Sequence, residues 1–232
     1  MGIQTEPMEM VLSLLPQLPP RFRVVELGDQ FITAPGEWSG KLAKEWYEHI
    51  GAGKYVSLDA NGLNGAIPFD LNRAVRKQDD PPTAELKSGF HLVTDFGTCE
   101  HVFNQAQCWQ TIHDLCRDGG FIAFDHPSQG YEGHGFYRLD WCLIAALMHA
   151  NDYEPLRLVE SETSRGRTIR GIMRKRGDAS FVVPQQGRYV KTLAVDVKAQ
   201  RRGPDHKNQE LRAAGVVGLR KPMERKDDER SS

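Results

Sequence analysis

Arg23-Val-Val-Glu-Leu-Gly28 is an apolar run that ends in an acid and then a glycine. Such a run indicates a buried strand, and a glycine turn directly after it lets the backbone approach a nucleotide-like cofactor. Lys54-Tyr-Val-Ser-Leu-Asp59 is a second apolar run, and its closing acid suits the two ribose hydroxyls of an adenosine. A third run, His91-Leu-Val-Thr-Asp95, turns polar and continues to Glu100-His101. Together the three runs indicate an adenosine-cofactor site at the strand ends of an α/β sheet.

Composition restricts the class of protein. The 232 residues suffice for one α/β domain with a full core. Lys and Arg number 30 against 31 Asp and Glu, so no overall charge favours nucleic acid or an anionic membrane. The four cysteines have no CxxC spacing, which indicates reduced thiols rather than a zinc or disulfide framework. No apolar run approaches the roughly 20 residues of a membrane-spanning helix, and we expect a soluble, cytoplasmic protein.

Apolar spacing and turn residues predict the order of the elements. The predicted helices span residues 6–15, 39–50, 104–117 and 139–150. The predicted strands span residues 22–27, 54–58, 66–71, 90–95, 121–124, 154–160 and 168–175. Ser39 is the expected N-cap of the second helix, and Gly119-Gly120 the expected stop of the third. Strands that alternate with helices and close with a pair of strands predict a mostly parallel sheet with an antiparallel edge and helices on both faces.

The chain divides into three expected parts. Residues 1–20 form an N-terminal helical extension, residues 21–197 the main domain, and residues 198–232 a charged tail that is poor in large apolar side chains. We expect this tail to be mobile, with a short helix near residues 208–214. Acids are mixed among its bases, which favours a solvated tail over a nucleic-acid arm.

The order of these features resembles class I S-adenosylmethionine-dependent methyltransferases over residues 22–175. Val24-Val-Glu-Leu-Gly-Asp29 is similar to the first motif of that family, in which the glycine lets the methionine part of the cofactor approach the backbone. Asp95-Phe-Gly-Thr-Cys-Glu-His-Val102 resembles the EHV form of the fourth motif, common in small-molecule methyltransferases, and Gly119-Gly120 resembles the usual start of strand five. The resemblance implies a Rossmann-like methyltransferase fold and S-adenosyl-L-methionine as cofactor.

The resemblance also implies roles for individual residues. Asp59 would hold the ribose, and Asp70 and Leu71 would contact the adenine. The full set of expected cofactor-binding residues is Glu26, Gly28, Gln30, Asp59, Asp70, Leu71 and Asp95.

The chain departs from the family at Gln30, where a second glycine is usual. A side chain there either crowds the methionine end of the cofactor or hydrogen-bonds its carboxylate or amino group. A non-catalytic binding protein with the same fold is therefore one alternative. A nicotinamide oxidoreductase is the other, but its G-x-G-x-x-G fingerprint is absent because Gln30 and Phe31 follow Gly28 in place of the required glycines.

Catalytic and acceptor-binding residues are expected at later strand ends. His101 is the leading candidate for a general base, because histidine titrates near physiological pH. A hydrogen bond to the neighbouring loop is the alternative role for His101, while Glu100 either binds a substrate hydroxyl or amine or orients His101. A glycine-rich loop from 125 to 137 is expected after strand five, where the family builds its acceptor pocket, and its glycines would allow a lid movement. Its candidate acceptor-binding residues are His126, Tyr131, His134 and Tyr137.

The nature of the acceptor is expected only in outline. The EHV-type motif and the lack of a basic face argue against a nucleic-acid substrate. A small-molecule or saccharide-like acceptor is expected, with a sugar, a lipid-linked saccharide, a natural product and a protein side chain all open. Although His101, His126 and His134 with Asp125 have suitable ligand types, no spacing such as H-E-x-x-H supports a metal site, and none is expected.

Overall fold

The computed structural model describes residues 2–75, 86, 89–185 and 209–210. Their main sheet consists of β2 (Arg23–Leu27), β4 (Lys54–Asp59), β5 (Ile67–Pro68), β6 (Phe90–Phe96), β7 (Cys116–Gly130), β8 (Glu154–Thr163), β9 (Gly166–Arg174) and β10 (Gln209–Glu210). Their order across the sheet is β10-β8-β9-β7-β6-β2-β4-β5. The five strands from β7 to β5 are parallel, whereas β9 is antiparallel to both β7 and β8, and β10 is antiparallel to β8. The predicted mostly parallel sheet with an antiparallel edge is confirmed.

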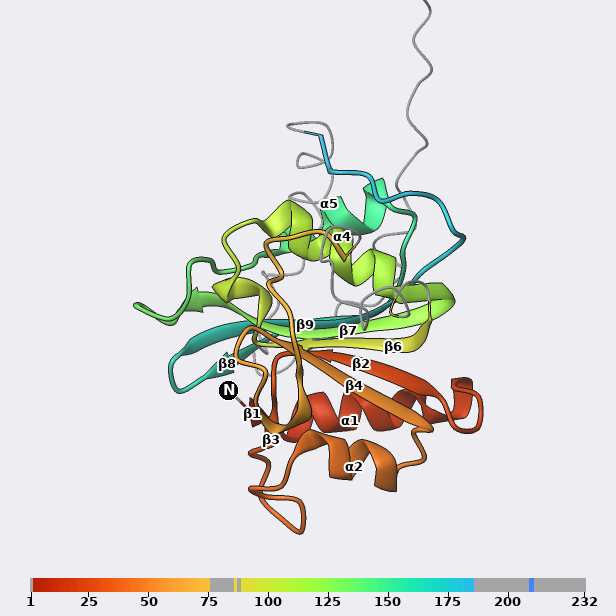
Figure 1. Ribbon diagram of the computed structural model, residues 1–232. Helices are drawn as coiled ribbons and strands as arrows, with labels where there is room; N and C mark the ends of the chain where they lie inside the picture. Colours follow the sequence, from red (N-terminus) through yellow and green to blue (C-terminus); the bar gives the residue numbers. More distant parts are fainter. Residues whose placement is uncertain (1, 76–85, 87–88, 186–208, 211–232) are drawn as a thin grey trace, which may run out of the picture.

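Helices cover both faces of the sheet (Figure 1). On one face lie α1 (Thr5–Leu14) and α2 (Ala43–His49), and on the other lie α4 (Gln105–Leu115) and α5 (Trp141–Ala150). Two short strands, β1 (Gly2–Ile3) and β3 (Phe31–Ile32), form a separate parallel pair. Among the described residues, no helix combines the length and the apolar character that crossing a membrane requires.

The central strands are apolar on both sides because both sides are covered. Val25, Val93 and Ile122 belong to the core cluster under α4 and α5. Their neighbours one residue away, such as Val24 and Leu92, belong to the cluster under α1 and α2. This alternation explains why β2 and β6 read as continuous apolar runs in the sequence.

Several predicted boundaries were wrong for identifiable reasons. The second helix begins at Ala43 rather than at Ser39, because Ser39 N donates to Gly36 O in a turn and Lys41 O accepts from Ile32 N. The third helix ends at Leu115, and Gly119-Gly120 lies inside β7 instead of stopping the helix.

Two further segments differ from expectation or lie outside the described residues. The predicted strand 66–71 is reduced to Ile67–Pro68, since Asp70 accepts from the backbone N–H of Asn72 in a turn. A short helix was expected near residues 208–214, but residues 209–210 form the strand β10. The rest of residues 198–232 lies outside the described residues.

The largest difference concerns β7. It continues to Gly130, because β9 pairs with it as far as the register Gly130↔Gly166. His126 was expected in a flexible loop but pairs with Ile169 within the sheet. The glycine-rich loop therefore begins only at Tyr131.

Candidate functional site

A glycine turn joins the carboxyl end of β2 to its neighbours. Gly28 has a φ of +91°, a conformation that favours glycine. A Cβ at Gly28 would lie 2.6 Å from Oγ1 of Thr98 and 2.8 Å from Nε2 of Gln30. Thr98 is itself fixed, since its Oγ1 donates to Leu27 O at 2.8 Å. The turn therefore requires glycine both for its backbone conformation and for lack of space.

The carboxylate of Asp59 lies beside this turn. Its Oδ2 accepts from Asp29 N at 2.9 Å, and its Oδ1 accepts from Asn61 N at the same distance. Gly28 N donates to Leu58 O at 2.7 Å, which ties the turn to the end of β4. The structure thus brings together Gly28 and Asp59, as the sequence predicted for two cofactor-binding residues.

Gln30 folds back over the turn. Its side chain is buried, and Nε2 donates to Phe96 O at the end of β6 at 3.4 Å. Among the residues that the structure describes, no hydrogen-bond donor reaches the Oε1 of Gln30. Buried polar atoms in folded proteins nearly always have a partner. An unpaired acceptor between the ends of β2 and β6 is a suitable place for an N–H donor of a ligand.

Glu26 lies beneath the turn rather than beside Asp59. Tyr55 Oη donates to its Oε2 at 2.6 Å, and Thr94 Oγ1 lies 3.5 Å from its Oε1, on the side of the sheet that α2 covers. Burial raises the pKa of Glu26 to about 8, although these hydrogen bonds oppose the shift. The carboxyl is therefore protonated at neutral pH and bonded within the interior.

The two residues expected near the adenine lie in the segment after β5. Asp70 is exposed, and its Oδ1 accepts from the backbone and the side chain of Asn72 at 2.9 Å each. Leu71 is buried and packs in the core cluster with Phe69. Solvent therefore reaches the side chain of Asp70 but not that of Leu71.

Buried charges meet at the ends of β6 and β7. His126 lies between two carboxylates, with Nε2 3.2 Å from Asp95 Oδ2 and Nδ1 3.0 Å from Glu100 Oε2. All three side chains are completely buried. Burial by itself would lower the pKa of His126, but the charges and hydrogen bonds of Asp95 and Glu100 raise it well above its ordinary value. Asp95 also accepts from the backbone N–H groups of Thr98 and Cys99 at 3.2 Å, which holds the turn after β6.

Glu100 also faces two further histidines. Nε2 of His134 lies 3.5 Å from Glu100 Oε1, and the rings of His101 and His134 contact edge to face with centroids 4.8 Å apart. Burial lowers the pKa of His101, and the neighbouring charge of His134 adds to this effect while Glu100 opposes it. The loop that carries His134 is anchored on Glu100, whose carbonyl accepts from Phe136 N and Tyr137 N at 2.8 and 3.1 Å.

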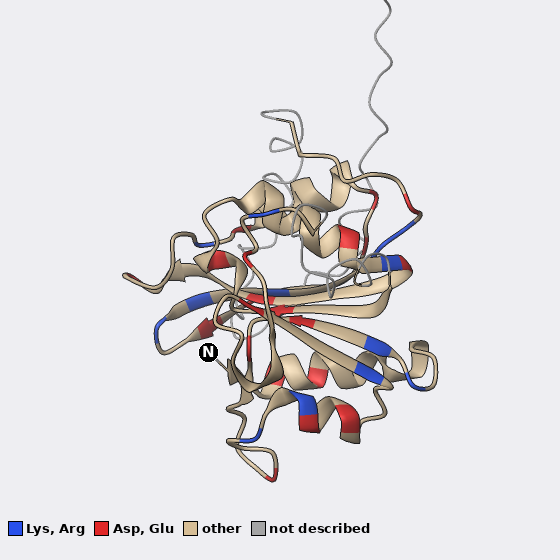
Figure 2. Cartoon of the chain, viewed as in Figure 1, with Lys and Arg blue, Asp and Glu red and all other residues tan. Residues whose placement is uncertain are grey.

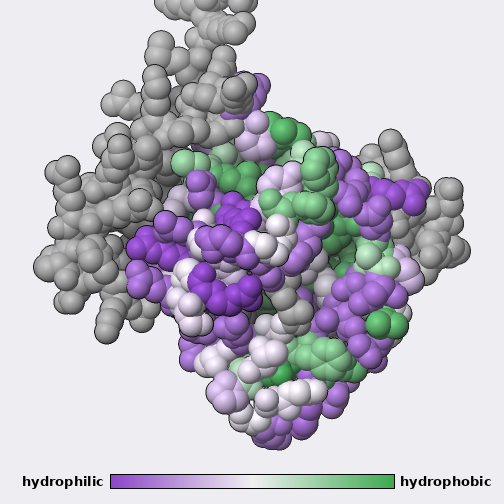
Figure 3. All heavy atoms as spheres, turned by 90° about the vertical axis from the view of Figure 1, so that its left-hand side faces the viewer, coloured by the Kyte–Doolittle hydropathy of each residue, from purple (hydrophilic) through white to green (hydrophobic). Residues whose placement is uncertain are grey.

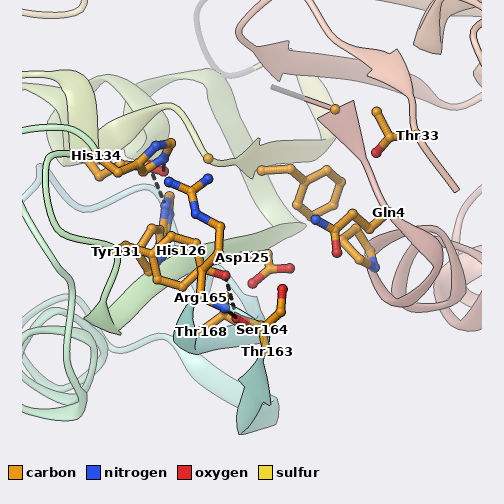
Figure 4. A pocket seen from close by; sticks show the side chains of 16 residues that line it. Gln4, Thr33, Asp125, His126, Tyr131, His134, Thr163, Ser164, Arg165 and Thr168 are labelled. Atoms are coloured by element: carbon orange, nitrogen blue, oxygen red, sulfur yellow. Dashed lines mark hydrogen bonds and ion pairs between the residues drawn. The ribbon is translucent and has the colours of Figure 1, made fainter.

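A pocket of about 400 Å³ opens at this edge of the sheet (Figure 4). Figure 2 shows acidic residues toward this end of the central strands and basic residues at the opposite ends of β2 and β4. Figure 3 views the molecule from this side and shows hydrophilic residues gathered on it. The expected acceptor residues Tyr131 and His134 line the pocket, and so does His126, although its side chain has no exposed surface. Tyr137 is not part of this lining; its hydroxyl donates to Phe103 O at 2.9 Å.

The opposite wall was not foreseen from the sequence. It comes from the turn between β8 and β9, where Arg165 lies over the ring of Tyr131 at 5.1 Å and Thr163 shares a hydrogen bond with the Tyr131 hydroxyl. Gln4 and Thr33 close the pocket from the side of β1 and β3. No local motif marks these four residues, because only the pairing of distant strands brings them here.

The sheet order is that of the Rossmann-like fold found in solved S-adenosylmethionine-dependent methyltransferases. No protein-family model and no curated protein matches the chain. Among solved structures, 1,6-didemethyltoxoflavin-N1-methyltransferase from Burkholderia thailandensis, with 1,6-didemethyltoxoflavin and S-adenosylhomocysteine bound, is similar at 14% identity and a TM-score of 0.51. The match covers 74% of this chain and 77% of that one.

The N-methyltransferase NodS from Bradyrhizobium japonicum, in complex with S-adenosylhomocysteine, is similar to the same degree. It is 13% identical with a TM-score of 0.51, and the match covers 74% of this chain and 87% of NodS. At these identities the similarity establishes the fold of this chain.

Proposed function

We propose that this protein transfers a methyl group from S-adenosyl-L-methionine to a small or medium-sized acceptor bound in the pocket beside Glu100. The observation that carries the proposal is the pairing of the Gly28 turn with Asp59 at one edge of a sheet that has the methyltransferase strand order. In open α/β sheets, ligands bind at the carboxyl ends of the strands, which is where both residues lie.

The residues present fit this cofactor. Glycine at position 28 lets the backbone turn at a φ of +91° and lets Thr98 and Gln30 pack directly against that turn. The carboxylate of Asp59 has further lone pairs for ribose hydroxyls, and the unpaired Oε1 of Gln30 would accept from the amino group of the methionyl part. Asp70 would lie near the adenine with Leu71 behind it, while Glu26 and Asp95 support the two turns. When bound, the cofactor supplies an electrophilic methyl group on a sulfonium.

The chain itself would bind and orient the acceptor. Much of the acceleration of a methyl transfer comes from holding the nucleophile in line with the methyl group. Tyr131 and His134 would hold the acceptor, and His101 would remove its proton. The lowered pKa of His101 supports that role, since the imidazole is neutral at physiological pH and able to accept a proton. Glu100, with His126 behind it, would position the two histidines.

A saccharide-like or other hydroxyl-rich small molecule is the acceptor that the pocket wall favours. Hydroxyl groups of Tyr131, Thr163 and Thr168 and the guanidinium of Arg165 line one side, with the carboxyl of Asp125 nearby. Such groups can donate to and accept from sugar hydroxyls.

Calorimetric titration of the purified protein with S-adenosylhomocysteine tests the proposal, with NADH as the control ligand. Saturable binding of S-adenosylhomocysteine alone is expected, and it would justify a screen of acceptors with a labelled methyl donor. Binding of NADH alone would favour the nicotinamide enzyme instead. Binding of neither would contradict the proposal.

Gln30→Ala separates the two possible effects of that side chain. If Oε1 accepts from the cofactor, the variant should bind S-adenosylhomocysteine about tenfold or more weakly, as expected for a hydrogen bond to a charged group. Tighter binding by the variant would mean that Gln30 crowds the site. Tight cofactor binding by the native chain without transfer to any acceptor class would support the non-catalytic binding protein.

A further inference from the structure

Three metal-ligand side chains converge at the rim of the pocket. Glu100, His101 and His134 each offer a ligand atom, and these atoms lie within 4.8 Å of one another. Glu100 and His101 are consecutive residues of the 3₁₀ turn Cys99–His101, directly after β6. His134 arrives from the loop after β7.

The loop is built to keep His134 at this place. Gly135 has a φ of +70°, and a Cβ there would lie 2.8 Å from the carbonyl oxygen of Glu100. The same carbonyl accepts from Phe136 N. Close contacts between the backbones of the two segments therefore hold His134 beside Glu100.

An unpaired buried oxygen points to a missing partner. Glu100 is completely buried, and among the described residues its Oε1 has no hydrogen-bond partner. Nε2 of His134 lies 3.5 Å from this oxygen. Its other oxygen, Oε2, is held by His126. A buried carboxylate oxygen that faces two imidazoles without a hydrogen bond is the arrangement that a cation would complete.

The residues behind Glu100 fit the same interpretation. Metal-binding carboxylates and histidines are normally oriented by hydrogen bonds from groups behind them. Here His126 holds Glu100, and Asp95 holds His126 at 3.2 Å. In the pocket wall, the guanidinium of Arg165 lies over the ring of Tyr131 at 5.1 Å.

We propose that Glu100, His101 and His134 bind one divalent transition-metal ion. Two imidazole nitrogens and one carboxylate oxygen suit Zn²⁺, Co²⁺, Mn²⁺ or Fe²⁺, and the pocket side of the cluster leaves coordination positions open. Asp95, Cys99 and His126 also lie close together, but that group is entirely buried and Asp95 Oδ1 already accepts two backbone N–H groups.

The binding of the ion does not depend on methyl transfer. A role for the ion in catalysis, however, rests on the proposed function. An ion at this place would coordinate an oxygen of the acceptor and lower the pKa of that oxygen. His101 would then be a ligand of the ion instead of the base that takes the proton. Hydroxyl-bearing acceptors with two neighbouring oxygens would gain most from such an ion.

The test uses the untagged full chain, freed of metal with a chelator and titrated with Co²⁺. Visible absorption reports the Co²⁺ environment, and calorimetry gives the stoichiometry. One equivalent should bind. His101→Gln and His134→Gln should each weaken Co²⁺ binding by at least the roughly 10–100-fold seen when residues behind a metal ligand are removed. Both side chains reach solvent, so the variants should remain folded, which circular dichroism verifies.

His49→Gln is the matched control, because it removes an exposed histidine of α2 and should bind Co²⁺ like the native chain. Absence of saturable binding, or equal binding by the native chain and both site variants, would overturn the metal site. A parallel titration with S-adenosylhomocysteine tests the proposed function separately. If the native chain binds S-adenosylhomocysteine but not Co²⁺, the metal site is wrong. If it binds Co²⁺ but not S-adenosylhomocysteine, the methyltransferase function is wrong.

Discussion

Nδ1 of His126 lies 3.0 Å from Oε2 of Glu100, and both side chains are completely buried. Asp95 holds the other nitrogen of the same ring, 3.2 Å away. An imidazolium between two carboxylates therefore joins the end of β6, the turn after it, and β7. Because Glu100 stands in the pocket wall, this buried arrangement sets the place of His101 and His134 next to it.

His126→Gln should destabilise the protein by about 3–5 kcal/mol, because removing one partner leaves buried carboxylates without the opposing charge. Urea unfolding at neutral pH measures the free energy of unfolding. The exposed control His49→Gln should change it by no more than about 0.5 kcal/mol. Equal stability of the two variants would mean that Asp95 and Glu100 do not rely on the charge of His126.

Glu26 should make the folded protein less stable as the pH rises. Burial raises the pKa of Glu26 to about 8 from the ordinary 4.5. Between these values the folded state keeps a proton that the unfolded chain has released, so stability falls by about 1.4 kcal/mol per pH unit. The contribution is full below pH 4.5 and lost by about pH 8. The raised pKa of His126 acts in the same direction above its ordinary value.

Glu26→Gln removes this titration and should flatten the curve between pH 5 and pH 8. Urea unfolding of the native chain and the variant at both pH values gives the two slopes. Glu48→Gln, a change at an exposed acid of α2, should keep the native slope. Parallel curves for native protein and Glu26→Gln would show that Glu26 is already ionised in the folded state.

Gly28→Ala should abolish measurable binding of S-adenosylhomocysteine and lower stability. Gly40→Ala is a matched control, since Gly40 has a φ of +79° but nothing within 4 Å of its Cβ position. Both changes force alanine into left-handed backbone, at about 1–3 kcal/mol. Only Gly28→Ala also collides with Thr98 and Gln30. Calorimetry should therefore find cofactor binding unchanged in the control, and a loss in both variants would trace the effect to overall stability.

Asp59→Ala should weaken binding of S-adenosylhomocysteine by roughly 1.5–3 kcal/mol, because hydrogen bonds from the ribose to a charged acceptor would be lost. Competition binding at fixed ionic strength measures the change. Glu48→Ala removes an exposed carboxylate elsewhere and should have no effect. Unchanged affinity in folded Asp59→Ala protein would remove the ribose assignment.

His101→Ala should reduce turnover by about 10²–10⁴-fold in metal-free protein if His101 is the base, with cofactor affinity retained. Initial rates with a labelled methyl donor and an identified acceptor provide the measurement. Restoring Co²⁺ to the native chain would then report whether the ion contributes. Near-native turnover of metal-free His101→Ala would leave His101 without a part in proton removal.

The accuracy of sequence interpretation depended on where the stabilising contacts come from. Arg23–Leu27 and Lys54–Asp59 were identified because a strand buried on both faces is apolar along its whole length. The extent of β7 was missed because residues 125–130 are polar and glycine-containing, and their strand conformation comes from pairing with β9. The start of α2 was missed for a related reason, since the residues around Ser39 bond across a loop.

The sequence by itself predicted a mostly parallel sheet with an antiparallel edge, and it placed Gly28 and Asp59 at strand ends, because apolar runs and their closing residues are local signals. Tertiary structure alone decided that His126 is a buried link between Asp95 and Glu100 instead of a residue of a mobile rim. It also decided that His134 reaches Glu100. The physical reason is that burial and charge pairing depend on which distant strands pack together, and no single segment records this.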